Sequence, residues 1–445
     1  MAFRGSGVQV PSAPPPQTGR WPDSLSLPPS AASPLPPTIS ARERVARATR
    51  HAPVDRAPVF CQLALGHYFL HAGLPPHRVW FTSEGFAEAL VTLQQRYRFD
   101  GILVNLPGRA PDALAGLRRV ESTEAAEVLH WRDGEVTVVP RDDNPRHQPP
   151  AGGPLPRANF AELDPDKLSD IDGLAGYWWN TYHVPRLVGK AASGLLEGVP
   201  DYFLRTLDLV RRATGGTVSV HGEVFSPFTQ FMELLGYEAA LLALLDDAAK
   251  ATALLDRLTE TALTWAVAQA RAGVDAVLVS SAFAGGGFLS RKMYAEFVLP
   301  HERRLAAAVQ ACGVPVYTHT CGRIGDRLDL MAATGIAGLD TLDPPPLGNT
   351  DLAEAKRTVG ARLFLKGNMN PVKLLSATSE SEVAGEASRC LTAGASGGGY
   401  ILSTACSVAP RVEPWKLELL VPLSEAFSAD GRLARESCAR GWTAS

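Results

Sequence analysis

The sequence contains no run of 18 or more apolar residues, so nothing in it predicts a membrane-spanning helix. A strong charge of one sign is also missing. The formal net charge is −3, which gives no electrostatic reason to expect nucleic acid or an acidic membrane surface as a partner. The N-terminus lacks the basic segment and apolar segment of a secretory signal peptide. These absences favour a cytoplasmic protein without nucleic-acid or membrane partners.

Cysteine is scarce, and its spacing does not resemble a disulfide framework. The 445 residues include six cysteines, at positions 61, 312, 321, 390, 406 and 438, with no cluster among them. In a chain of this length such spacing favours free thiols or metal ligands in a reducing compartment.

Residues 1–40 are rich in proline, serine and glycine and are predicted to be a disordered N-terminal extension. Their composition also fits a start codon assigned too far upstream. The chain is 45% hydrophobic and 20% charged, an ordinary balance with enough apolar material for a large core. We expect this core within residues 41–430, followed by a C-terminal tail at 431–445.

Eight short apolar runs alternate with helical patterns along the predicted folded part. The predicted strands are Pro58–Leu63, Gly101–Asn105, Thr217–His221, Val274–Ser280, Val314–Thr318, Gly338–Leu342, Leu363–Lys366 and Tyr400–Ser403. Strands that alternate with helices form parallel sheets, and eight such units match a closed (β/α)₈ TIM barrel better than an open sheet. One predicted helix, from about Ser290 to Cys312, contains Pro300 and should be kinked there.

The alternation of strands and helices stops after the second predicted strand, from about residue 106 to about residue 198. Residues Val128 to Val139 have the pattern of a hairpin that turns at Asp133-Gly134. The densest aromatic cluster of the chain follows at residues 177–183. The segment has too few periodic elements to bury a core of its own, so we interpret it as a long insertion from one barrel loop.

A histidine and two cysteines follow the ends of two predicted strands. His319 and Cys321 come after the fifth strand, and Cys406 comes after the eighth. Loops after the strands of a TIM barrel share one face, so these residues should lie close together. One imidazole and two thiolates suit Zn²⁺ and leave a fourth position open, as in catalytic zinc sites. A His and a Cys two residues apart also occur by chance, so the pattern alone leaves a purely structural role open.

Several motifs resemble the uroporphyrinogen decarboxylase superfamily over most of the predicted folded part. They are A-R-E-R-V-A-R-A-T-R-H-A-P-V-D-R-A-P-V at 41–59, G-E-V-F-S-P-F-T at 222–229, H-T-C-G at 319–322, L-K-G-N-M-N-P at 365–371 and G-G-G-Y-I-L-S-T-A-C at 397–406. Within this superfamily the chain looks most like the corrinoid-dependent methyltransferases of the cobalamin:coenzyme M type. The resemblance implies a TIM barrel.

Departures from the decarboxylase pattern favour the methyltransferase branch. Where the decarboxylases carry the arginine-rich M-R-Q-A-G-R-Y, this chain has Cys61-Gln62-Leu63-Ala64-Leu65-Gly66-His67-Tyr68, without arginine. Asn105 stands near the position of an aspartate that binds pyrrole N–H groups in the decarboxylases. Cys406 stands where they have the histidine of G-H-G-I-x-P. His319, Cys321 and Cys406 match the zinc ligands of the methyltransferase branch.

The resemblance therefore implies a zinc-dependent methyltransferase that moves a methyl group between a corrinoid protein and a small thiol or methylated compound. No D-x-H-x-x-G corrinoid-binding motif occurs in the chain, so the corrinoid should be supplied by a partner protein. Two alternatives stay open: a uroporphyrinogen decarboxylase-like lyase of porphyrin biosynthesis, and a barrel that binds a metal or tetrapyrrole without turnover.

The remaining candidate residues are less specific. Glu223, after the third strand, is a candidate fourth metal ligand, although a loop carboxylate that binds backbone N–H groups explains it equally well. Asn105, His183 and Ser281 are candidate substrate-binding residues, with packing as the alternative for the aromatic cluster around His183. Asp340 and Asp343 could act as an acid/base pair or in turns. The glycine triplets at 285–287 and 397–399 lack P-loop spacing and should turn tightly or let the backbone pass close to substrate.

Overall fold

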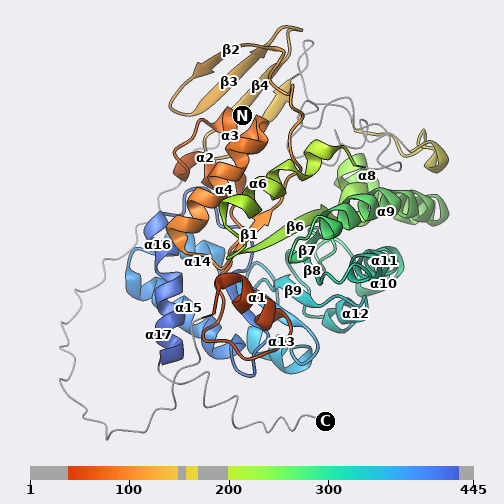
Figure 1. Ribbon diagram of the computed structural model, residues 1–445. Helices are drawn as coiled ribbons and strands as arrows, with labels where there is room; N and C mark the ends of the chain where they lie inside the picture. Colours follow the sequence, from red (N-terminus) through yellow and green to blue (C-terminus); the bar gives the residue numbers. More distant parts are fainter. Residues whose placement is uncertain (1–38, 149–156, 169–198, 430–445) are drawn as a thin grey trace, which may run out of the picture. The chain divides into compact units, whose positions relative to one another are not determined.

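The structure is a computed structural model, and it describes residues 39–148, 157–168 and 199–429. Seven parallel strands form one curled sheet in the order β1-β6-β7-β8-β9-β10-β11, with helices outside it (Figure 1). Their bounds are Gly101–Val104, Ser219–Phe225, Ala276–Ser280, Val316–His319, Gly338–Thr341, Phe364–Met369 and Tyr400–Thr404. Each strand of this sheet lies beside the next one of the same sheet along the chain, and all neighbouring pairs are parallel. These seven strands agree with seven of the eight predicted runs.

The helices of the first half are α1 (Ala41–Thr49), α2 (Leu65–His71), α3 (Pro76–Phe81), α4 (Ser83–Tyr97), α6 (Arg205–Ala213), α7 (Pro227–Leu235), α8 (Tyr237–Asp246) and α9 (Ala248–Arg271). Those of the second half are α10 (Arg291–Phe297), α11 (Leu299–Gln310), α12 (Leu328–Ala332), α13 (Leu352–Thr358), α14 (Pro371–Ser376), α15 (Glu380–Gly394), α16 (Pro414–Glu418) and α17 (Leu420–Ala429). Short 3₁₀ helices cover Pro165–Lys167 and Asp201–Leu204. The kink predicted at Pro300 is a break at Val298, and Pro300 lies in the first turn of α11.

No single helix among the described residues is long and apolar enough to cross a membrane. The neighbouring helices α7 and α8 meet the length and composition criteria only together, with a bend of 109° between them.

The first predicted strand, Pro58–Leu63, forms isolated bridges instead of a regular strand. Val59 pairs in parallel with Leu402, and Leu63 pairs with Val408. The backbone N–H of Phe60 donates to the carbonyl of Leu402 at 3.0 Å, and the N–H of Asp100, just before β1, donates to the carbonyl of Val59 at 2.8 Å. This segment therefore contacts the chain at both edges of the seven-stranded sheet.

Apolar side chains divide into two buried clusters according to strand alternation. Ile401 belongs to a smaller cluster with Leu103, Leu278, Tyr317 and Phe364, whereas the neighbouring Leu402 belongs to the larger one. Successive side chains of a strand point to opposite faces, so the smaller cluster fills the concave side of the curled sheet and the larger one packs against the helices. Val45 and Ala48 of α1 pack on the smaller cluster.

The insertion contains more regular structure than the hairpin that the sequence predicts. An antiparallel sheet comprises β2 (Leu117–Ser122), β3 (Ala126–Trp131), β4 (Val136–Pro140) and β5 (Arg146–Gln148). The predicted turn at Asp133-Gly134 joins β3 to β4, with Gly134 at φ 89°. Alternate residues of β3 and β4, among them Leu129, Trp131 and Val139, are buried, and α3 contacts this sheet. The aromatic cluster at 177–183, with His183, lies outside the described residues.

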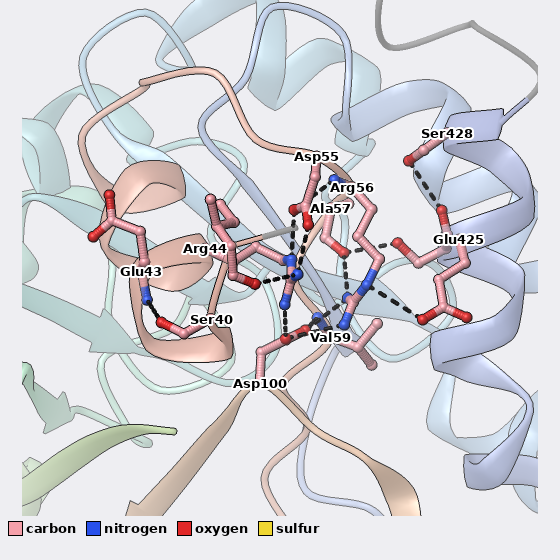
Figure 2. Close-up of polar contacts among 12 residues, drawn as sticks. Ser40, Glu43, Arg44, Asp55, Arg56, Ala57, Val59, Asp100, Glu425 and Ser428 are labelled. Atoms are coloured by element: carbon pink, nitrogen blue, oxygen red, sulfur yellow. Dashed lines mark hydrogen bonds and ion pairs between the residues drawn. The ribbon is translucent and has the colours of Figure 1, made fainter. Parts of the chain in front are cut away.

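A buried ion cluster joins α1, the segment at 58–63 with its isolated bridges (the bridge segment) and α17 (Figure 2). Ser40 caps α1 by accepting from the N–H of Glu43 at 3.1 Å. Arg44 of α1 makes a two-bond contact with Asp55, at 2.6 Å each, and donates to Asp100 at 2.6 Å. Arg56 donates to the other oxygen of Asp100 at 2.7 Å, and the N–H of Val59 reaches the same oxygen at 2.8 Å. Asp100 is 1% exposed, so its charge depends on these partners.

Replacement of this carboxylate should destabilise the protein strongly. We expect Asp100→Asn to lower the free energy of unfolding by about 3–5 kcal/mol, because two buried guanidinium groups lose their shared anion. Urea denaturation followed by circular dichroism measures this loss. The control is Glu88→Gln, which breaks a half-exposed pair with Arg78 and should cost about 0–1 kcal/mol. Equal losses in the two variants would contradict the structural role of the cluster.

Candidate metal centre

The predicted ligands lie where two strands of the sheet end. His319 is the last residue of β8, and Cys321 follows two positions later, so both side chains point to the same side of the extended backbone. Cys406 lies two residues beyond Thr404, the end of β11. Because β8 and β11 run parallel within one sheet, their carboxyl ends lie on the same face. The structure therefore brings together residues that are separated by 85 positions in the chain.

The three side chains form a compact set of metal-ligating atoms. The Nε2 atom of His319 lies 3.4 Å from Sγ of Cys321 and 3.9 Å from Sγ of Cys406, and the two sulfurs are 3.9 Å apart. Bonds of about 2.0–2.3 Å from a tetrahedral ion place neighbouring ligand atoms roughly 3.5–3.8 Å apart. A disulfide would need an S–S distance of about 2.05 Å, and both cysteines are free thiols. The spacing thus matches three corners of a tetrahedral site.

Asp340 orients the imidazole of His319 from behind. Nδ1 of His319 lies 3.2 Å from Oδ2 of Asp340 in the neighbouring strand β9, which leaves Nε2 directed at the sulfurs. Lys366 in β10 donates to both oxygens of Asp340, at 2.9 and 3.0 Å. Burial by itself would raise the pKa of Asp340, but Lys366 and His319 together hold it below its usual range. A ligand histidine bonded to a carboxylate in this way is common at protein metal sites.

Asp343 and Gly285 hold the loop that carries Cys321. Oδ2 of Asp343 accepts from the N–H of Gly322 at 2.6 Å. A Cβ atom at Gly285 would lie 2.3 Å from the carbonyl oxygen of Cys321, so only glycine permits this approach. For the first glycine triplet, the predicted approach of backbone to substrate stays a prediction, and the observed close neighbour of Gly285 is the backbone of Cys321. The three glycines at 397–399 have φ of 73°, 73° and 64°, which confirms a tight turn for the second triplet.

The protonation of the three side chains is strongly coupled in the absence of a metal. Burial lowers the pKa of His319, but Asp340 and the Cys406 sulfur outweigh it and raise the value to about 10. The hydrogen bond from the Cys321 thiol, together with His319, lowers the pKa of Cys406, while the same bond and burial raise the pKa of Cys321. These directions favour an ionised Cys406 beside a protonated His319 when no metal is bound.

Glu223 lies on β6, buried in the same sheet, but it does not join the compact set. The described residues that could hold a metal together, with ligand atoms within 4.8 Å of one another, are His319, Cys321 and Cys406. Burial raises the pKa of Glu223 to about 7, although the positive charge of His319 and a hydrogen bond from Ser280 partly oppose it. The backbone N–H of Glu223 donates to the side-chain oxygen of Gln269 at 3.0 Å.

The predicted substrate-binding residues lie in different environments. Asn105 is partly buried just after β1. Ser281 follows β7 and is fully buried, and its N–H donates to the carbonyl of His319 at 2.8 Å. His183 belongs to the part of the chain that the structure does not describe.

Sequence analysis missed Lys366, although a signal was present. It is the charged residue at the end of the otherwise apolar run Leu363-Phe364-Leu365. A lysine that extends a buried strand needs a carboxylate partner, and Asp340 occupies a similar position in the preceding predicted strand. Asp340 and Asp343 had been considered as an acid/base pair or as turn residues. In the structure Asp340 contacts the candidate ligand His319, and Asp343 accepts from the N–H of Gly322, next to the candidate ligand Cys321. The acid/base role stays a prediction.

Comparison with known proteins gives three findings. The family model described as uroporphyrinogen decarboxylase (URO-D) matches residues 192–427. Curated relatives include the uroporphyrinogen decarboxylase of Syntrophotalea carbinolica, 33% identical over 51% of this chain and 64% of the relative, and that of Rhodococcus opacus, 32% identical over 54% and 65%. The chain thus spans less than two thirds of the length of these relatives. A methyltransferase from Methanosarcina mazei shares the fold, with a TM-score of 0.62, 18% identity and coverage of 87% of this chain and 99% of that chain.

The coupled protonation predicts how many protons a metal ion displaces. A bound ion requires neutral His319 at Nε2 and an ionised Cys321, so we expect Zn²⁺ to release about two protons per chain at pH 7. Zinc affinity should then fall by up to about 100-fold for each pH unit of acidification, because protons compete for both ligands. Calorimetric titration in buffers of different ionisation enthalpy counts the protons. Exposed Cys312→Ser should leave the count unchanged, and a count near zero would contradict zinc binding through protonated ligands.

Proposed function

Since the chain belongs to the uroporphyrinogen decarboxylase family, as the match over residues 192–427 shows, we propose that it is a zinc-dependent methyltransferase. It moves a methyl group between a corrinoid held by a partner protein and a small thiol or methylated compound in the cytoplasm. We propose further that the bridge segment at 58–63 closes the curled sheet into an eight-stranded barrel. The clustering of His319, Cys321 and Cys406 at the ends of β8 and β11 is the observation that carries this proposal.

The donor set suits Zn²⁺ and leaves room for a reactant. His319, Cys321 and Cys406 would hold the ion, and the tetrahedral preference of zinc leaves a fourth position for a substrate sulfur. Zinc bound there would supply Lewis acidity, which lowers the pKa of a coordinated thiol. The two cysteine thiolates donate negative charge, so a sulfur beside them stays nucleophilic. Asp340 fixes the imidazole so that Nε2 faces the sulfurs.

Other side chains are proposed to assist at the same face of the sheet. Glu223 remains a candidate fourth ligand for the substrate-free state, and its carboxylate must move to bind the same ion because it lies outside the compact set. With a pKa of about 7 it can also take a proton from an incoming thiol at neutral pH. Asn105, Ser281 and His183 remain proposed substrate contacts.

A second candidate function follows from the curated relatives, whose printed name is uroporphyrinogen decarboxylase. The bridge segment and the following helix α2 argue against it. Cys61-Gln62-Leu63 and the first residues of α2 offer no arginine for the carboxylates of a porphyrinogen. A barrel that binds a metal or tetrapyrrole without turnover is the third possibility.

Metal content and turnover separate these functions. We expect about one zinc per purified chain, and its loss in Cys321→Ser and Cys406→Ser, because two remaining ligands bind weakly. Cys312→Ser, which changes an exposed thiol, should keep the zinc. Methyl transfer from a methylcorrinoid to a panel of thiols should require the metal.

The opposite results are equally informative. A wild-type protein without zinc would reject the methyltransferase, and turnover of uroporphyrinogen in the absence of metal would establish the decarboxylase. Zinc binding without transfer to or from any corrinoid would leave the binding barrel.

A further inference from the structure

Three ionisable side chains form a continuous row across the middle of the sheet. His319 on β8 pairs in register with Asp340 on β9, and Asp340 pairs in register with Lys366 on β10. In-register residues of parallel strands point to the same face, so the row runs along the concave side of the curled sheet. All three residues are buried, with 5%, 1% and 2% of their surface exposed.

Both oxygens of the Asp340 carboxylate, at the centre of the row, have close polar partners. Oδ1 of Asp340 accepts from Nζ of Lys366 at 2.9 Å and from the N–H of Thr341 at 2.9 Å. Oδ2 accepts from Lys366 at 3.0 Å and lies 3.2 Å from Nδ1 of His319. Lys366 thus hydrogen-bonds both oxygens of Asp340 and helps to fix the orientation of the carboxylate relative to the imidazole.

Lys366 contributes a positive charge to a site that is rich in acidic groups. The site contains the sulfurs of Cys321 and Cys406, and the buried carboxyl groups of Asp340 and Asp343 lie beside it. Among the described residues, Asp340 is the only carboxylate that forms an ion pair with Lys366. The ammonium group also lies 5.2 Å from the centre of the Phe60 ring, which closes it off on another side.

We infer that Lys366 is a positioning residue of the metal centre, which acts through Asp340 to hold His319 ready to bind the ion. This inference rests on the proposed zinc site. Loss of the ammonium group leaves the buried carboxylate with only the Thr341 N–H and His319 as partners, so both its charge and its orientation are less well supported and the imidazole is held less firmly. Metal affinity and coordination geometry then change, although none of the three ligand residues has been altered.

The test measures metal binding, independently of turnover. We expect Lys366→Met to weaken zinc binding by about 10- to 100-fold, the effect typical of a lost partner behind a ligand histidine. Competition with a chromogenic chelator gives the affinity. The visible absorption spectrum of the Co²⁺-substituted protein should change as well, because it reports the geometry of the ligands.

A double-variant cycle distinguishes action through Asp340 from general damage. If Lys366 acts through Asp340, then Lys366→Met combined with Asp340→Asn should bind zinc no more weakly than Asp340→Asn alone. The double variant removes both charges, so it also avoids the buried unpaired carboxylate that could unfold the single variant. Lys416→Met is the matched control, because Lys416 on α16 has the same 2% exposure but pairs with Glu413, the residue that precedes this helix, and not with a member of the row.

Each outcome bears on a different claim. Wild-type zinc affinity in Lys366→Met, or losses that simply add in the double variant, would overturn the positioning role while the proposed function stands. An equal loss in Lys416→Met would also overturn it, because any buried lysine would then have the same effect. A wild-type protein that binds no zinc would instead overturn the proposed function and, with it, this inference.

Discussion

The parallel register of the sheet is the constraint on which the site depends. Strands that run in the same direction bring all their carboxyl ends to one face, so residues 85 positions apart in the chain place their sulfurs 3.9 Å from each other. The same register aligns His319, Asp340 and Lys366 in one row behind the ligands. A one-residue slip of β9 would turn Asp340 to the opposite face and leave both of its partners unpaired.

Buried charged groups form two separate clusters around this sheet. The cluster around Asp100 links α1, the bridge segment and α17, and each of its charges has a close partner. At the ends of β8 and β11, two sulfurs and a histidine converge, and their contacts raise the pKa of His319 and lower that of Cys406. We expect the first cluster to stabilise the fold, and we propose that the second binds a metal ion. Perturbed pKa values of this kind are typical of functional sites.

Family membership and local chemistry support different levels of conclusion. The matched family fixes the ancestry of the chain, and the curated relatives carry the name of a decarboxylase. The likeness to the Methanosarcina methyltransferase, at 18% identity, establishes a common fold. The choice between the activities that this fold supports is a proposal from the side chains at the site, because function depends on those side chains. Three soft donors at tetrahedral spacing therefore carry the proposal.

The sequence by itself determined the strands, because strand alternation and apolar runs are local properties. Seven predicted runs are regular strands, and the candidate ligands His319, Cys321 and Cys406 were recognisable from their places after two of these runs. Only the tertiary structure decided the rest. The run at 58–63 forms isolated bridges, and the insertion contains a four-stranded sheet instead of one hairpin, since strand pairing depends on distant partners. The pairing of Asp340 with Lys366 could not be predicted for the same reason, because the partner of a charge in a buried strand depends on which strand the fold places beside it.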